Sequence, residues 1–273
     1  MAISSFVAVL CALCVSAVSM NHATAGPLAG IEGIYDGPEA LAKAAGPVVV
    51  VLDTEHPDRV KEELAKEPKL PYKCLRLKKK VEEISGLPCL VVHYSQVTRK
   101  DLDNANIKAI LISARKKRLS KEGDDEFFAF IRETRIPTLG SCGGHELIVQ
   151  AYSGKIAKMR PLRPGEKDPN PDYWPGTFKE WGFQKIRVVK KDPLFDGLPD
   201  EPVVREFHSW EITELPDCFE VLASTDECKV EALRHKEKPM YGTQFHAELY
   251  DEKHPDGRAI LQNFLRIAGG LAR

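Results

Sequence analysis

Short runs of β-branched residues alternate with amphipathic segments through the first half of this sequence. The runs PVVVVLD (47–53), PCLVVH (88–93) and IKAILIS (107–113) have the composition of buried strands. A segment with helical spacing of its apolar residues, Ser120–Arg135, follows the third run. Strands that alternate with helices form parallel sheets, because a parallel connection needs a crossover that is usually a helix. The sequence therefore predicts an α/β fold with a mainly parallel central sheet flanked by helices.

The second half continues this pattern with a larger share of strands. We expect a strand at 136–139, a helix at 145–153 that ends at Gly154, strands at 185–189, 203–208, 219–223, 229–233 and 241–245, and a final helix at 257–268. Residues 160–178 hold five prolines and are predicted to form an irregular insertion. The sequence contains no internal repeat, so we expect residues 26–273 to form a single domain.

The first 25 residues differ from the rest. An apolar run extends from Phe6 to Val15, no charged side chain precedes Glu32, and Ala23-Thr24-Ala25 has the form of a signal cleavage site. We therefore expect residues 1–25 to be a cleaved signal peptide, and the protein to be secreted or periplasmic rather than cytoplasmic. The run is shorter than the roughly 20 residues that span a bilayer, so no stable membrane insertion is expected after cleavage.

The charge of the chain is nearly balanced, because 39 basic and 40 acidic residues give a formal net charge of −1. Such a chain has no overall field that attracts nucleic acid, and no nucleic-acid partner is expected. The basic runs Arg76–Lys80 and Arg115–Arg118 carry no interleaved aromatic residues. We interpret both runs as solvated surface.

Seven cysteines occur, of which five follow residue 25. The pairs Cys74–Cys89 and Cys218–Cys228 could form disulfides in an oxidising compartment, and the sequence does not decide between bonded and free thiols. No cysteine pair is followed by a second pair, or by paired histidines, at the spacing of a zinc site. We expect neither a metal nor another cofactor.

The segment GSCGG (140–144) places Cys142 between glycines, at the expected junction of a strand and a helix. Small neighbours permit the tight turn that projects a nucleophile. A helix N-terminus favours thiolate over thiol, and the free amide of Gly143 can stabilise an oxyanion. Cys142 is therefore a candidate nucleophile, although a small buried thiol in a turn has the same local sequence. His145 is either a substrate contact or a partner of the helix terminus.

A second segment, YGTQFHAE (241–248), supplies a candidate base and a group to orient it. In an extended strand, residues i and i+2 point to the same side. The Glu248 carboxylate can then orient the His246 imidazole, which leaves the other ring nitrogen for the Cys142 thiol.

The segments PTLGSCGGHE and YGTQFHAE resemble the two signature motifs of class I glutamine amidotransferases, in the order Cys, His, Glu. The resemblance covers roughly Val48–Ala268 and includes EWGFQKIRVVKKDPLFDGLPD (180–200) and REFHSWEITELPDCFEVLAST (205–225). It implies the flavodoxin-like fold of that family. It also implies a Cys142–His246–Glu248 triad that forms a γ-glutamyl thioester, which water then hydrolyses.

Further site residues follow from the same resemblance. It implies oxyanion amides at Gly143 and Ala114, and substrate contacts from Glu146, His208 and Ser209. Two positions depart from the family pattern. Glu146 stands where the family usually has glutamine and is similar to the residue that γ-glutamyl hydrolases of the same superfamily carry. The loop Leu111–Lys116 replaces a Gly-Gly-Pro-like loop that normally supplies one oxyanion amide.

Three functions are compatible with these features. The first is a cysteine-dependent amidohydrolase that cleaves a small-molecule amide, either glutamine or a γ-glutamyl compound. The second is a catalytically silent binding domain on the same fold. The third is a glutaminase subunit that feeds ammonia to a synthetase partner. The sequence does not predict the oligomeric state.

Overall fold

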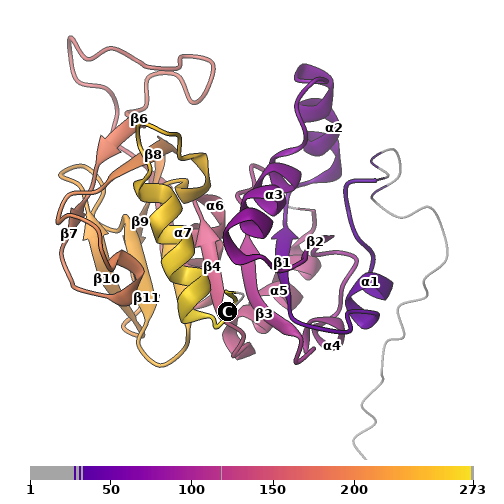
Figure 1. The fold of residues 1–273 in the computed structure, drawn as a ribbon. Coiled ribbons are helices and arrows are strands. Elements are labelled where there is room, and N and C mark those ends of the chain that lie inside the picture. Colours follow the sequence, from indigo (N-terminus) through magenta and orange to yellow (C-terminus); the bar gives the residue numbers. More distant parts are fainter. Residues whose placement is uncertain (1–27, 29–30, 32, 118, 272–273) are drawn as a thin grey trace, which may run out of the picture.

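An eight-stranded sheet forms the centre of the computed structural model, which describes residues 28, 31, 33–117 and 119–271 (Figure 1). Five neighbouring strands are parallel: β2 (Cys89–His93), β1 (Val48–Asp53), β3 (Ile107–Ile112), β4 (Thr138–Ser141) and β12 (Met240–Thr243). The antiparallel strands β11 (Ala232–His235), β10 (Phe219–Ser224) and β7 (Arg187–Val188) continue the sheet beyond β12. The predicted α/β class with a mainly parallel sheet is confirmed.

Helices cover both faces of this sheet. Side chains alternate along β1, so that Val49 and Val51 face one hydrophobic cluster and Val50 and Leu52 face another. The first cluster includes residues of α2 (Pro57–Lys66), α3 (Lys73–Ser85) and α7 (Asp256–Ile267). The second includes residues of α1 (Pro38–Ala42), α4 (Arg99–Leu102), α5 (Lys121–Glu133) and α6 (Gly143–Ala151). The molecule therefore has three layers, with α3 and α7 on the near side of the sheet in Figure 1.

Two further strand pairs lie outside the central sheet. β5 (Lys155–Lys158) pairs with β9 (Trp210–Glu214), and β6 (Glu180–Lys185) pairs with β8 (Val203–His208). Between β5 and β6, residues 160–178 form turns and the isolated bridge Pro161–Thr177. Short 3₁₀ helices, η1 (Pro193–Phe195) and η2 (Ala247–Leu249), precede β8 and follow β12.

Several elements differ at their ends from the expected bounds: β4, β7 and β11, for example, replace the strands expected at 136–139, 185–189 and 229–233. The helix α6 ends at Ala151, and the residue with a left-handed backbone is Ser153, with φ of 66°, rather than Gly154. Gly154 is required for space instead, because a Cβ there would lie 2.3 Å from Val149 Cγ1. The strand expected at 241–245 is β12, which ends at Thr243. The Gln244 amide still donates to the Glu231 carbonyl at 2.7 Å, in register with the pairing of β12 and β11.

Three expectations concern the chain as a whole. The signal segment expected over residues 1–25 lies outside the described residues. Within the described residues, no helix is both long and apolar enough to cross a membrane. The cysteines at 74, 89, 142, 218 and 228 are all free thiols, so neither of the two candidate disulfides is formed.

Candidate active site

Cys142 lies in a strained turn between β4 and α6. Its backbone has φ of 50° and ψ of −111°, a region that residues with a Cβ rarely adopt. The turn is fixed at both ends: the Cys142 amide donates to the Thr243 carbonyl at 2.7 Å, and the Glu146 amide donates to the Cys142 carbonyl at 3.1 Å. Such strain costs about 1–3 kcal/mol and persists only where the surrounding structure holds it. The geometry is that of a nucleophile elbow.

His246 and Glu248 follow β12 and line the same pocket as Cys142. His246 Nδ1 is 2.6 Å from Glu248 Oε1, and the His246 amide donates to the Arg205 carbonyl at 2.9 Å. The contact expected between the two side chains is present, but the expected reason is wrong. The pair lies at the start of η2, so a turn and not an extended strand brings the carboxylate onto the imidazole.

The proton on His246 is held by its neighbours. Burial alone would lower the pKa of His246, but the Glu248 carboxylate and the Cys142 sulfur raise it to about 10. Burial raises the pKa of Glu248, but the imidazolium outweighs this and holds it below its usual range. The pair therefore has the charges of an imidazolium beside a carboxylate, close enough to Cys142 to stabilise negative charge on sulfur.

Lys80 anchors the segment that follows the histidine. Its Nζ donates to the carbonyls of Glu248 and Tyr250, and it lies 3.9 Å from the centroid of the Tyr250 ring. The interpretation of Arg76–Lys80 as solvated surface is therefore wrong for Lys80. It agrees with the structure at Lys79, whose side chain is 80% exposed.

Gly143 brings α6 against the loop that follows β3. A Cβ on Gly143 would lie 2.8 Å from the Arg115 nitrogen and 3.3 Å from Ala114 Cα, and one on Gly144 would lie 2.3 Å from the Ile112 carbonyl oxygen. Only glycine permits this approach. The main chain of residues 114 and 115 therefore lies beside the Gly143 amide, which is in the first turn of α6 and has no partner within its helix.

Buried polar contacts hold this loop in place. The Ser113 hydroxyl donates to Asp53 at 2.8 Å, Lys73 donates to the Ala114 carbonyl at 2.7 Å, and Arg115 makes two hydrogen bonds to Asp124 at 2.6 and 2.8 Å. The Arg115 side chain is only 12% exposed. The interpretation of residues 115–118 as solvated surface is therefore wrong for Arg115, which is a buried anchor.

Glu55 extends the same anchoring to the next two residues. Its carboxylate accepts from the amides of Lys116 and Lys117 at 2.9 and 3.1 Å. The Lys116 ammonium lies 5.4 Å from the centroid of the Tyr173 ring and faces the pocket. Charged side chains thus hold the loop that replaces the Gly-Gly-Pro-like segment.

The Gln244 side chain lies close to both Cys142 and Glu146. Its side-chain amide nitrogen lies 3.8 Å from Cys142 Sγ and 3.3 Å from Glu146 Oε1. Burial raises the pKa of Glu146 to about 7, although Gln244 and more distant cations lower it. The sequence segment YGTQFHAE contains Gln244, but nothing in its pattern predicts this contact.

The remaining candidate residues are buried. His145 is fully buried, its Nε2 lies 3.1 Å from the Val230 carbonyl, and burial lowers its pKa to about 3, so it is a core residue rather than either expected partner. His208 is 1% exposed and Ser209 is fully buried. The substrate contacts expected from His208 and Ser209 remain predictions.

Two pockets meet at Cys142. One, of about 400 Å³, is lined by Cys142, His246, Glu248 and Ala114 and runs along α2 and α3. The other, of about 480 Å³, is lined by Cys142, Gly143, Glu146 and His208. Tyr173, from the insertion, lines both. The sequence does not predict a role for Tyr173, because proline-rich turns carry no periodic signal.

Comparison with known proteins identifies the same family as the two motifs. Residues 76–268 match the family described as glutamine amidotransferase class-I. The glutamine-hydrolysing GMP synthase subunit of Methanococcus vannielii is 34% identical over 184 residues, which cover 67% of this chain and 86% of that protein. The protein of the same name from Pyrococcus abyssi is 37% identical over 139 residues, 51% of this chain and 64% of that protein.

A solved structure supports the fold. The crystal structure of a GMP synthase subunit from Thermoplasma acidophilum has a TM-score of 0.62 and 24% sequence identity. It covers 82% of this chain and 94% of that one. The predicted fold of the glutamine amidotransferases is confirmed.

The prediction of a secreted or periplasmic protein is contradicted by these relatives, which are subunits of archaeal GMP synthases and not secreted hydrolases. The apolar run at 6–15 is a weak basis for it. Hydrophobicity alone does not define a secretory signal, and the segment before this run lacks the lysine or arginine that such signals carry.

Family membership rests on the match over residues 76–268 and on a relative that shares a third of its residues across most of its length. The turn at Cys142 and the His246–Glu248 pair lie in the two segments that carry the resemblance to this family. The chain belongs to the class I glutamine amidotransferase family, whose enzymes act on amide C–N bonds.

Proposed function

We propose that this chain is a glutaminase subunit that hydrolyses the side-chain amide of glutamine and passes the ammonia to a synthetase partner. The observation that carries the proposal is the strained backbone of Cys142, which presents its sulfur to a pocket that also contains the paired His246 and Glu248. The names of the relatives, glutamine-hydrolysing subunits of GMP synthase, support the ammonia-donor role over a free-standing amidohydrolase or a silent binding domain.

The first half of the reaction forms a thioester. The Cys142 thiolate attacks the amide carbon of glutamine, so that a C–S bond forms and the carbonyl oxygen becomes an oxyanion. The His246 imidazolium gives its proton to the amide nitrogen, the C–N bond breaks, and ammonia leaves. Glu248 stabilises the imidazolium and holds the ring in the orientation that this transfer needs.

The second half restores the enzyme. His246, now neutral, takes a proton from water while the water oxygen attacks the thioester carbon. The C–S bond then breaks, glutamate leaves, and the Cys142 thiolate faces the imidazolium again.

Main-chain amides stabilise the oxyanion in both halves. The Gly143 amide is one donor, and the amide of Ala114 or Arg115 is the other, since their backbone lies against Gly143. Loss of one such donor typically costs about 10²–10³ in rate. The polar contacts that hold residues 113–117 therefore position one of the oxyanion donors.

The zwitterionic end of glutamine fits the pocket on the Glu146 side. Glu146 offers a carboxylate to the α-ammonium group, and Lys116, which lines the same pocket, offers an ammonium to the α-carboxylate. Tyr173 also lines this pocket.

The chemistry is tested by covalent labelling and by turnover. A diazoketone analogue of L-glutamine should add one equivalent to the full chain, located at Cys142 by peptide mapping. Cys142→Ala should lose both the label and ammonia release from glutamine, while Cys218→Ala, the matched thiol control, should keep both. A folded parent protein that takes no label would overturn the catalytic assignment.

The partner role is tested separately. Adding this chain to an ammonia-dependent synthetase from the same organism should make product formation depend on glutamine, and Cys142→Ala should leave only the ammonia-dependent rate. If the chain instead cleaves γ-glutamyl peptides faster than glutamine, and no synthetase changes that rate, the free-standing amidohydrolase is the correct function.

A further inference from the structure

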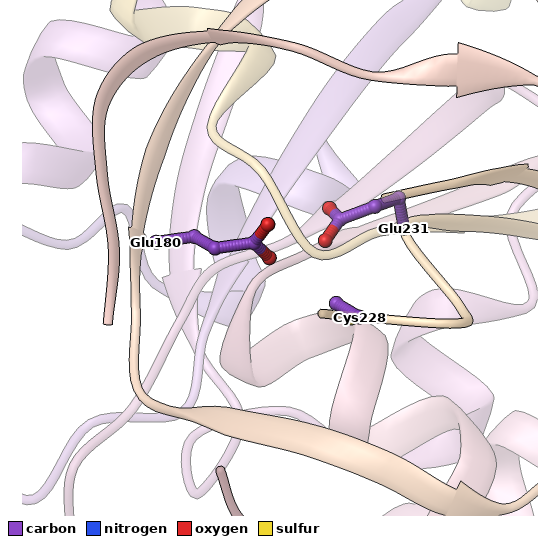
Figure 2. A group of neighbouring side chains, drawn as sticks. All are labelled: Glu180, Cys228 and Glu231. Carbon is purple, nitrogen blue, oxygen red and sulfur yellow. The ribbon is translucent and has the colours of Figure 1, made fainter. Parts of the chain in front are cut away.

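A cluster of buried acidic side chains surrounds His208, outside the proposed reaction. His208 Nε2 lies 3.2 Å from Glu180, 3.3 Å from Glu206 and 3.7 Å from Glu231. All four side chains are at most 4% exposed. Figure 2 shows the carboxylates of Glu180 and Glu231 pointing toward one another, with Cys228 beside them.

The contacts in this cluster have ion-pair distances but lack the geometry of hydrogen bonds. His208 Nε2, both oxygens of Glu206 and both oxygens of Glu231 have no hydrogen-bond partner among the described residues. Three buried carboxylates around one imidazole are costly unless protons or a cation neutralise them. The polar atoms instead converge on a common space, as ligands do around an ion.

The other nitrogen of His208 fixes the ring for metal binding. Nδ1 lies 2.9 Å from the Trp210 carbonyl oxygen, which can only accept, so Nδ1 carries the proton. Against the effect of burial, Glu180, Glu206 and Glu231 raise the pKa of His208, so a metal ion would take the place of the Nε2 proton and bind the lone pair that faces the carboxylates. Metal-binding histidines are typically oriented by such a hydrogen bond from the second nitrogen.

The spacing suits a small transition-metal ion. Ligand atoms of Glu206, His208 and Glu231 all lie within 4.8 Å of one another, as do those of Glu180, Cys228 and Glu231. In a tetrahedral zinc site with bonds of about 2.0–2.1 Å, ligand atoms are about 3.3–3.4 Å apart. The distances from His208 Nε2 to Glu180 and Glu206, 3.2 and 3.3 Å, fit that geometry, whereas Glu231 at 3.7 Å would have to move a few tenths of an ångström closer. Imidazole combined with carboxylates selects zinc and its neighbours over magnesium or calcium.

We propose that His208, Glu206 and Glu231, with Glu180 beside them, bind one divalent transition-metal ion such as Zn²⁺. The sequence has no metal-binding motif, because the ligands come from three separate segments: β6, β8 and the turn before β11.

The ion would tie together parts of the fold that the central sheet does not join. β6 and β8 form a separate two-stranded sheet, whereas Glu231 directly precedes β11 of the central sheet. The Glu231 carbonyl accepts from the amide of Gln244 at 2.7 Å, and the Gln244 side chain approaches Cys142 Sγ. The metal would therefore fasten the β6–β8 pair to the sheet directly behind the nucleophile.

The test uses the full chain carrying Cys142→Ala, so that the active-site thiol cannot bind metal. After treatment with a strong chelator and dialysis, the protein is titrated with Zn²⁺ against a chromophoric chelator. We expect one ion per chain, and a rise in Tm of about 5–10 °C at a hundredfold excess over the Kd. X-ray absorption of the zinc-loaded protein should show nitrogen and oxygen ligands at about 2.0–2.1 Å.

Isosteric variants identify the ligands. Glu206→Gln and Glu231→Gln should weaken zinc binding at least tenfold and abolish the rise in Tm, while Glu214→Gln, an exposed glutamate of β9, should change neither. Both ligand variants remove a buried charge, so the metal-free proteins should fold, which circular dichroism checks. Absence of zinc binding at micromolar concentration, unchanged binding in both variants, or a shell dominated by sulfur would each overturn the proposal.

Discussion

The backbone of Cys142 is strained, and this strain makes a prediction about stability. At φ of 50° a Cβ costs about 1–3 kcal/mol, which glycine would relieve. Glycine also adds about 0.5–1 kcal/mol of entropy cost on folding. We therefore expect Cys142→Gly to be more stable than Cys142→Ala by about 1 kcal/mol, with both inactive, as measured by urea unfolding.

Cys218 provides the matched control for this prediction. It is a free thiol, and among the described non-glycine residues only Cys142, Ser153 and Trp174 have positive φ. At Cys218 the order should reverse, with the glycine variant less stable than the alanine variant. If glycine is also the less stable choice at position 142, the turn is not strained.

Glu146 makes a prediction about pH. Burial raises its pKa in the folded protein to about 7, against 4.5 for the ordinary group. Between these values the folded state binds more protons than the unfolded state, so its stability falls as the pH rises through this window. Glu146→Gln lacks this penalty, and its stability relative to the parent should increase by about 1–3 kcal/mol between pH 5 and pH 8.

Urea unfolding of both proteins at the two pH values measures this difference. Glu126→Gln, an exposed glutamate on α5, should show the same small change at both values. If the free energy of unfolding changes equally with pH in the parent and in Glu146→Gln, the pKa of Glu146 is not raised in the folded protein, and this prediction is wrong.

At the scale of single elements, the loop after β3 depends on the pair Arg115–Asp124. Arg115→Met leaves Asp124 buried without its partner, which should cost about 3–5 kcal/mol. Adding Asp124→Leu removes that charge and should restore most of the stability. The kcat for glutamine should fall by about 10- to 100-fold in both the single and the double variant, because residues 114 and 115 lose the anchor that positions their amides.

Stability and kcat together separate two roles of this pair. Recovery of stability without recovery of kcat means that the pair positions the loop for catalysis. If the double variant regains the parent kcat, the pair only stabilises the fold, and the loop needs no such anchor.

Elements with a local signal are the ones that the sequence predicts. The runs at 47–53, 88–93 and 107–113 are buried on both faces, so their apolar composition alone marks them as strands. In α3, by contrast, the buried residues Cys74, Leu77 and Val81 are separated by charged residues, and the helical spacing is hard to see. The strand expected at 203–208 is β8, but the sequence predicts neither β6 nor its pairing with β8, because this pairing depends on contacts between distant segments.

In the candidate active site, too, the sequence predicts the residues that lie in local motifs and misses those that only tertiary packing brings there. Cys142, His246 and Glu248 lie in two short motifs, whereas Arg115 and Tyr173 reach the pocket only through tertiary packing. Gln244 lies within the second motif, but its approach to Cys142 Sγ leaves no pattern in the sequence. The buried Arg115–Asp124 pair shows why charge alone misled the prediction for residues 115–118: a charged run is solvated only if no buried counter-charge faces it.

At the scale of the whole molecule, we infer that the described parts unfold as one unit. Val204 of β8 packs in the same hydrophobic cluster as Ile260 of α7 and Val49 of β1, although β8 is not hydrogen-bonded to the central sheet. Separating the β6–β8 pair would therefore expose apolar surface of α7 to water.

The three tryptophans make this testable. Trp174, Trp181 and Trp210 lie in the insertion, in β6 and in β9, so fluorescence reports on this side of the molecule. The Trp174 and Trp210 ring centroids are 5.9 Å apart, and those of Trp181 and Phe207 are 3.9 Å apart with tilted rings. Far-UV circular dichroism reports instead on helices throughout the chain. Because one cluster joins the two regions, the urea midpoints from fluorescence and from circular dichroism should coincide.

A fluorescence transition at clearly lower urea would mean that the insertion and the β6–β8 pair open before the central sheet unfolds. This opening would release the Arg205 carbonyl from the His246 amide. Glutaminase activity should then be lost at the lower urea concentration, while the circular dichroism signal is still that of the folded protein.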